Sequence, residues 1–475
     1  AILADCAPDA MLDLPAWGDG QTPLDLLSAG RSGFYGEFDE VAVGSVLDAV
    51  RRHLYLGFGA EARQYAELVS QSDAPPELAY YRSMSRLVEG ETDPSTPFAR
   101  MLPCGGPAAL WAALAHDRLP PGPEVNVDAI LRSFVALPAH LRNSLGPGLA
   151  QKMLDRGDDD AARLIRDSME RAPFSDSVAI ALLDAKAELH ADRPEAAQAH
   201  AEAAAAGAGA DVAPLVTLVE AHLRRAEPIS PEVAASLQAV LGESEGRPDE
   251  AEIRRALILA FALSGQTDAA FDAAEGEVPP ALWQVAGQLA PDDAFLSHAV
   301  LATATPRPEV PEAVQGQIAR RLLDLGFSDA ALRWLEPVER TAPPEQRLLA
   351  AEAELLRGDA RAALSLLDNL DTPESEPLRA RANVQLGAYA PARAALLASG
   401  DVDAAERLLA WEKDWTGLSA EGAEPWRAAA ALMAADEEEA EAGLLARGTR
   451  LAEEGARARE TVAELLTRVP SPAAP

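Results

Sequence analysis

A glycine motif with the spacing of a cofactor-binding turn occurs early in the chain. Gly57 and Gly59, followed by Ala62, have the G-x-G-x-x-A spacing of a dinucleotide-binding turn. That turn requires a buried strand before it, but residues 47–56 show the apolar spacing of a helix. We therefore interpret these glycines as a turn between two helices, and we expect no cofactor.

One serine and seven histidines are among the other residues whose types could support catalysis or metal binding. Ser32, within Gly30-Arg31-Ser32-Gly33-Phe34, resembles a nucleophile elbow, but that motif needs glycine where Phe34 stands. The seven histidines include no H-x-x-x-H or HExxH pair, so the sequence offers no zinc site. The run Asp158–Asp160 stands at an expected helix start, where carboxylates cap the helix. The sequence therefore predicts neither a catalytic nor a metal site.

Cysteines and tryptophans give the remaining candidate sites. Cys6 and Cys104 belong to no CxxC pair, and they either form one disulfide in an oxidising compartment or are two unrelated thiols. Trp334, Trp411 and Trp415 lie late in the chain. Such residues can fill the gaps between helices that carry mostly small side chains. The alternative is that they anchor a protein partner, since tryptophan is favoured at binding hot spots.

Composition excludes several partner classes. The 475 residues carry 41 basic and 76 acidic side chains, a net charge of −35, which disfavours nucleic acid and anionic lipid as partners. The longest apolar run, 256–263, is far shorter than the roughly 20 residues of a membrane span, so we expect no membrane insertion. Aromatic residues make up 5% of the chain, and abundant alanine suits closely packed helices.

A helix-turn-helix pattern centred on Leu322–Leu335 organises the rest of the chain. Gly326 can end one helix in the left-handed conformation, and Ser328 or Asp329 can cap the next. The adjacent alanines at 330 and 331 then allow close packing. The same pattern recurs at glycines 157, 265, 358, 387 and 400, and Asp192 occupies the glycine position once.

These repeats resemble tetratricopeptide repeats. Ala161, Ile165, Ser168 and Pro173 stand at offsets 0, 4, 7 and 12, as in the second helix of that repeat. The resemblance covers roughly 150–410, with a further candidate stretch at 45–90. It implies an all-α fold, an α-solenoid of antiparallel helix pairs stacked into a right-handed superhelix.

Changes in composition suggest five segments along the chain. They are an irregular N-terminal segment (1–44, with a short helix at Pro23–Ser28), divergent helical hairpins (45–145), the repeat solenoid (146–420), longer C-terminal helices (421–469) and a disordered tail (470–475).

The expected function is a non-catalytic scaffold that binds other proteins within a larger assembly. The chain begins with Ala1 instead of Met, which together with the even number of cysteines favours a processed, periplasmic protein over a cytoplasmic one. It is similar to the periplasmic repeat proteins of alphaproteobacterial envelope machines, including flagellar motor accessories. The alternatives are a cell-wall enzyme or enzyme accessory with a helical superstructure, and a cytosolic tetratricopeptide-type regulator or chaperone adaptor.

Overall fold

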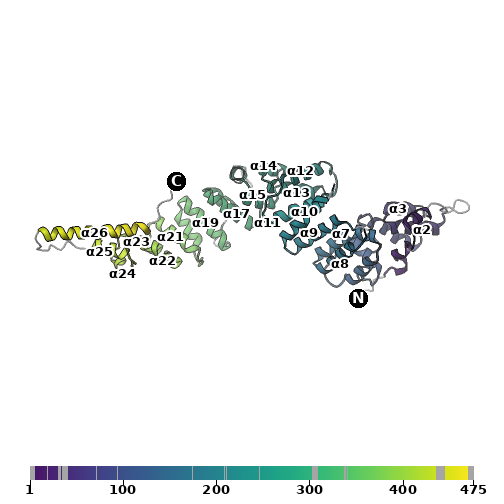
Figure 1. The fold of residues 1–475 in the computed structure, drawn as a ribbon, viewed down its shortest axis with the longest axis horizontal. Coiled ribbons are helices and arrows are strands. Elements are labelled where there is room, and N and C mark those ends of the chain that lie inside the picture. The colour runs from purple at the N-terminus through teal and green to yellow at the C-terminus, as the bar shows by residue number, and fades with distance from the viewer. Residues whose placement is uncertain are drawn as a thin grey trace. The chain divides into compact units, whose positions relative to one another are not determined.

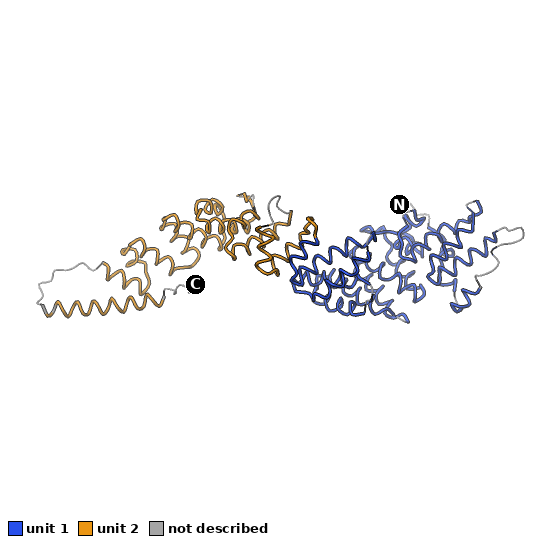
Figure 2. Tube along the Cα trace, turned by 90° about the horizontal axis from the view of Figure 1, so that it is seen from above, with its two compact units in different colours: residues 1–273 blue, residues 274–475 orange. Residues whose placement is uncertain are grey.

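The structure is a computed structural model that divides into two compact units, residues 1–273 and 274–475 (Figure 2). It describes residues 6–18, 20–29, 34, 41–70, 72–93, 95–173, 175–207, 209, 211–244, 246–301, 309–335, 338–339, 341–434 and 444–468. The described residues form an all-α fold without strands, and successive helices pack in pairs as an α-solenoid (Figure 1). The fold class expected from the sequence is therefore confirmed.

Unit 1 begins with two short 3₁₀ helices and continues with helix pairs. Its elements are η1 (Asp9–Met11), η2 (Leu14–Gly18), α1 (Pro23–Ala29), α2 (Val43–Leu56), α3 (Gly59–Glu67), α4 (Pro76–Leu87), α5 (Pro107–Ala115), α6 (Val127–Ala136), α7 (Ala139–Arg156), α8 (Asp159–Glu170), α9 (Ser177–His190), α10 (Pro194–Gly207), α11 (Ala213–Arg225), α12 (Pro231–Gly242), α13 (Glu250–Leu263) and α14 (Thr267–Ala273). Its largest apolar core lies among the helices from α2 to α8.

Unit 2 contains the clearest succession of helix pairs and ends in the longest helix. Its elements are α15 (Pro280–Leu289), α16 (Asp292–Leu296), the π-helical turn η4 (Ser297–Leu301), α17 (Glu312–Asp324), α18 (Ser328–Leu335), α19 (Pro344–Arg357), α20 (Ala360–Leu367), α21 (Ser375–Gln385), α22 (Tyr389–Ser399), α23 (Val402–Glu412), α24 (Trp415–Glu421), α25 (Trp426–Ala434) and α26 (Leu444–Arg468). The first helices of neighbouring pairs, α15, α17, α19 and α21, also contact one another in that order.

A left-handed residue joins the two helices of most pairs, as the glycine pattern predicted. At Gly326 φ is 85°, its amide donates to Leu323 O, and the next amide, of Phe327, donates to Leu322 O. These two bonds satisfy carbonyls that the end of α17 would otherwise leave unpaired. The same pair of bonds follows left-handed residues at Gly57, Gly157, Asp192, Gly265, Gly358, Gly387 and Gly400.

The residue after the left-handed one precedes the second helix, and its side chain caps that helix where it is an aspartate. Asp359 accepts a hydrogen bond from the amide of Ala362, and Asp401 accepts one from Ala404. At the turn before α18 this position is Phe327, and the helix begins at Ser328. The proposal that Ser328 or Asp329 caps α18 therefore placed the cap one or two residues too late.

The glycine-rich turn at 57–59 lies between helices, as predicted. Gly57 ends α2 with φ of 83°, and Gly59 begins α3. A Cβ added at Gly59 would lie 2.1 Å from the carbonyl oxygen of Ser85, so only glycine allows α3 to approach α4 this closely. Ser32, for which a nucleophile elbow was rejected, and the expected disordered tail, 470–475, lie outside the described residues.

Candidate functional site

The two cysteines are joined in the structure. A disulfide links Cys6 to Cys104 with an S–S distance of 2.01 Å, and it fastens the N-terminal segment to the loop before α5. Leu12 and Leu14, which follow Cys6, are fully buried in the core of unit 1. The N-terminal segment is therefore held both covalently and by apolar packing.

The tryptophans proposed as partner anchors have different surroundings. Trp334 is 2% exposed, its indole nitrogen donates to Ala299 O at 3.0 Å, and its ring packs edge-on against Trp283. It is therefore part of the core of unit 2 and is not available to a partner. Trp411 is 63% exposed, while Trp415 is half-buried against a small cluster of α23–α25. The structure does not bring these three residues into one site.

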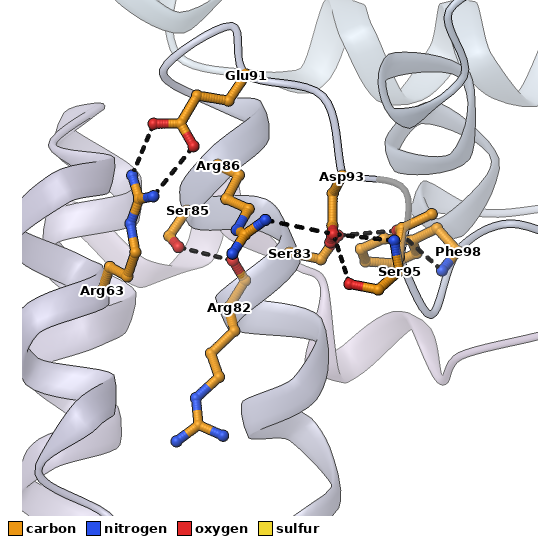
Figure 3. Close-up of polar contacts among 10 residues, drawn as sticks. Arg63, Arg82, Ser83, Ser85, Arg86, Glu91, Asp93, Ser95 and Phe98 are labelled. Atoms are coloured by element: carbon orange, nitrogen blue, oxygen red, sulfur yellow. Dashed lines mark hydrogen bonds and ion pairs between the residues drawn. The ribbon is translucent and has the colours of Figure 1, made fainter.

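Charged and hydroxyl side chains form a polar cluster beside α4 (Figure 3). Arg63 binds both oxygens of Glu91 at 3.0 Å. The buried carboxylate of Asp93 accepts hydrogen bonds from the amide and hydroxyl of Ser95, and lies 3.8 Å from Arg86. Because these groups pair with one another, we infer that the cluster holds the loop that follows α4 in place.

The best candidate site is a groove between α17 and α19 in unit 2. It has a volume of about 560 Å³. Ala313 and Gly316 of α17 leave the space, and Leu348 and Leu349 of α19 supply its apolar surface. A Cβ added at Gly316 would lie 3.6 Å from a methyl carbon of Leu349, an ordinary contact, so the groove exists because larger side chains are missing here.

Polar side chains border the groove and give it an acidic rim. Glu312 and Glu345 are exposed at its edge. The one arginine among its lining residues, Arg320, is neutralised by Glu352 of α19 at 2.6 Å. Gln317 donates to Gln284 O of α15, which fixes the adjacent helix. The groove can therefore accept an apolar segment whose flanking charges are positive.

Nothing in the sequence analysis singled out these groove residues. They belong to no motif, and the two sides of the groove are about 30 residues apart in the chain. The only available signal was the helical spacing of Ala313, Gly316 and Arg320, which is compatible with many other helix faces.

Among the described residues, no three histidine, cysteine, aspartate or glutamate side chains come together as metal ligands would. None of the helices in the described ranges has both the length and the apolar character needed to cross a membrane. Comparisons of the chain with known protein families and with curated proteins give no match.

Proposed function

We propose that the chain is a non-catalytic scaffold that binds a positively charged segment of another protein in the groove between α17 and α19. The observation that carries this proposal is the combination of an apolar groove with the exposed carboxylates of Glu312 and Glu345. Stacked first helices of successive pairs provide a continuous surface of the kind that solenoids use for binding.

The repeats themselves are proposed to be tetratricopeptide-like. Support comes from the recurring left-handed turn and from the contacts between first helices of neighbouring pairs. Ala161 and Ile165 of α8 are both buried, as small and large packing residues of such a repeat would be.

A periplasmic setting is proposed for the same scaffold. The disulfide between Cys6 and Cys104 supports it, because disulfides persist in oxidising compartments such as the bacterial periplasm. Within that compartment we propose a structural role in an envelope assembly, such as an accessory ring of a flagellar motor. The basis for this last step is the resemblance to periplasmic repeat scaffolds.

The test begins with the complex purified from the source organism, in which crosslinking and mass spectrometry identify the protein bound at 312–349. The purified partner is then titrated against the wild-type chain and Gly316→Leu, whose longer side chain fills the groove. Gly148→Leu is the control, because Gly148 is an exposed helical glycine outside the groove with nothing within 4 Å of an added Cβ.

We expect Gly316→Leu to weaken binding by at least tenfold and Gly148→Leu to leave it unchanged. Equal binding by both variants would remove the groove from the proposal. A chain that purifies alone and hydrolyses a cell-wall or peptide substrate would overturn the scaffold function itself.

A further inference from the structure

A second pocket, in unit 1, lies between two successive helix pairs. It has a volume of about 360 Å³ and is lined by residues of α7, α8, α9 and α10. Ala162 of α8 and Ala187 of α9 are among the small side chains that leave its interior open, and Leu154 and Leu183 add apolar surface. The size is at the small end of the range found for ligand pockets.

The charges around this pocket differ from those of the chain as a whole. The chain has 76 acidic and 41 basic side chains, yet the pocket is lined by equal numbers of carboxylates and guanidinium groups. These are Asp159, Asp184, Glu188, Arg163, Arg166 and Arg193. A lining that sums to zero suits a ligand that carries both charge signs more than it suits a simple anion or cation.

Four of these six charged groups form ion pairs with one another within the pocket lining. Arg166 donates to both carboxylate oxygens of Asp184 at 2.9 Å, which ties α8 to α9. Arg193 pairs with Glu188, and that hydrogen bond lowers the pKa of the Glu188 carboxyl. These two pairs therefore hold the walls of the pocket in place.

The other two groups have their partners outside the lining. Arg163 bonds to Asp160 at 2.7 Å, and Asp159 lies 3.1 Å from His190, which is charged only when protonated. Asp159 and Arg163 are four residues apart on α8, a spacing that places side chains on the same face, with Cβ atoms about 5–6 Å apart. Asp159 and Arg163 therefore lie on the same face of α8 and both line the pocket, whose lining also includes the apolar side chains of Leu154, Ala162 and Leu183.

We propose that this pocket binds a free α-amino acid with an apolar side chain, as a zwitterion. Asp159 receives its ammonium group and Arg163 its carboxylate, while the side chain enters the space beside Ala187. This site is separate from the protein-binding groove, and its ligand is a small molecule.

Isothermal titration calorimetry with L-leucine tests the proposal on the full-length chain. Leucinamide, which lacks the carboxylate, and 4-methylpentanoate, which lacks the ammonium group, are titrated in parallel. We expect saturable binding of L-leucine and at least tenfold weaker binding of each analogue. No saturable binding of L-leucine at concentrations up to about 10 mM, or equal binding of the three compounds, would overturn the proposal.

Variants locate the site. Arg163→Gln should weaken L-leucine binding by about tenfold, since a charge-assisted hydrogen bond is lost. Ala187→Leu should abolish binding by filling the pocket, whereas Ala199→Leu, at an exposed position of α10 outside the lining, should bind as wild type. Circular dichroism melts establish that each variant is folded. A folded Ala187→Leu protein that still binds L-leucine would contradict the assignment.

Discussion

At the scale of single residues, arginine side chains donate hydrogen bonds to the last carbonyl groups of several helices. Arg347, which is 7% exposed, donates to Leu366 O at 2.9 Å and to Asp368 O at 2.5 Å, at the end of α20. Arg321 likewise donates to Ala286 O and Ala290 O at the end of α15. A planar guanidinium can satisfy two carbonyls at once, so these residues pair groups that the helix ends leave open.

Replacement of Arg347 tests this role. Lysine keeps the charge but cannot reproduce the forked pair of hydrogen bonds, so Arg347→Lys should lower the free energy of unfolding by about 1–2 kcal/mol. Arg361, exposed on α20, is the control site, and Arg361→Lys should change stability by less than about 0.5 kcal/mol. Urea denaturation measures both, and equal effects at the two sites would refute a special role for Arg347.

Lys152 also pairs carbonyl groups at the end of a helix, and its titration makes the free energy of unfolding depend on pH. Its ammonium group donates to Leu114 O at 2.6 Å and to Ala113 O at 3.3 Å, at the end of α5. Burial lowers the pKa of Lys152, and the nearby charge of Asp117 opposes this shift without cancelling it. Between that lowered pKa and the ordinary lysine value, the unfolded chain holds the proton and the folded chain does not.

The free energy of unfolding should therefore rise with pH across this window through the contribution of Lys152. Lys152→Met cannot titrate, so the difference in stability between wild type and Lys152→Met should shift in favour of wild type as pH increases towards the ordinary lysine pKa. Denaturant titrations from pH 7 to about pH 10.5 measure the difference. A difference that stays constant with pH would show that Lys152 has no depressed pKa.

At the scale of helices and turns, the left-handed turn residue defines the repeat. Glycine makes this turn visible in the sequence, and the turns at Gly326 and Gly358 were predicted for that reason. Ala226 and Lys413 adopt the same conformation, with φ of 52° and 62°, and were not predicted. Other residues can take this conformation at a cost of about 1–2 kcal/mol, so packing can impose the turn where the sequence shows no signal.

Substitutions at the turns measure that cost. Ala226→Gly should stabilise the chain by about 0.5–1 kcal/mol because the strain is removed, and Gly326→Ala should destabilise it by at least about 1 kcal/mol. Ala199→Gly, on the exposed face of α10, is the helical control and should destabilise by about 1 kcal/mol. Thermal unfolding distinguishes these signs, and a destabilised Ala226→Gly would contradict the assignment of strain there.

At the scale of the whole molecule, stacked helix pairs form two compact units. The recurring helix-turn-helix pattern in the sequence predicted this stacking, but it predicted neither the groove nor the unit 1 pocket. The groove depends on Gly316 facing Leu349, and the unit 1 pocket is lined by residues that come from four helices, among them Asp159 of α8 and Ala187 of α9. Which residues of neighbouring helices come together depends on how one helix pair packs on the next. Short spacings in the sequence do not determine that packing. The partner role considered for Trp334 shows the same limit, because its helical spacing suits a core or a surface equally.

The central claim, that the groove between α17 and α19 binds a protein partner, can be tested inside the cell. A photo-crosslinking amino acid placed at Ala313, within the groove, should join the chain to one partner protein through a segment rich in lysine or arginine. The same amino acid at Ala199, an exposed site in unit 1, should not form that product. If Ala313 gives no crosslinked protein, or gives the same products as Ala199, the groove is not the binding surface and the account fails.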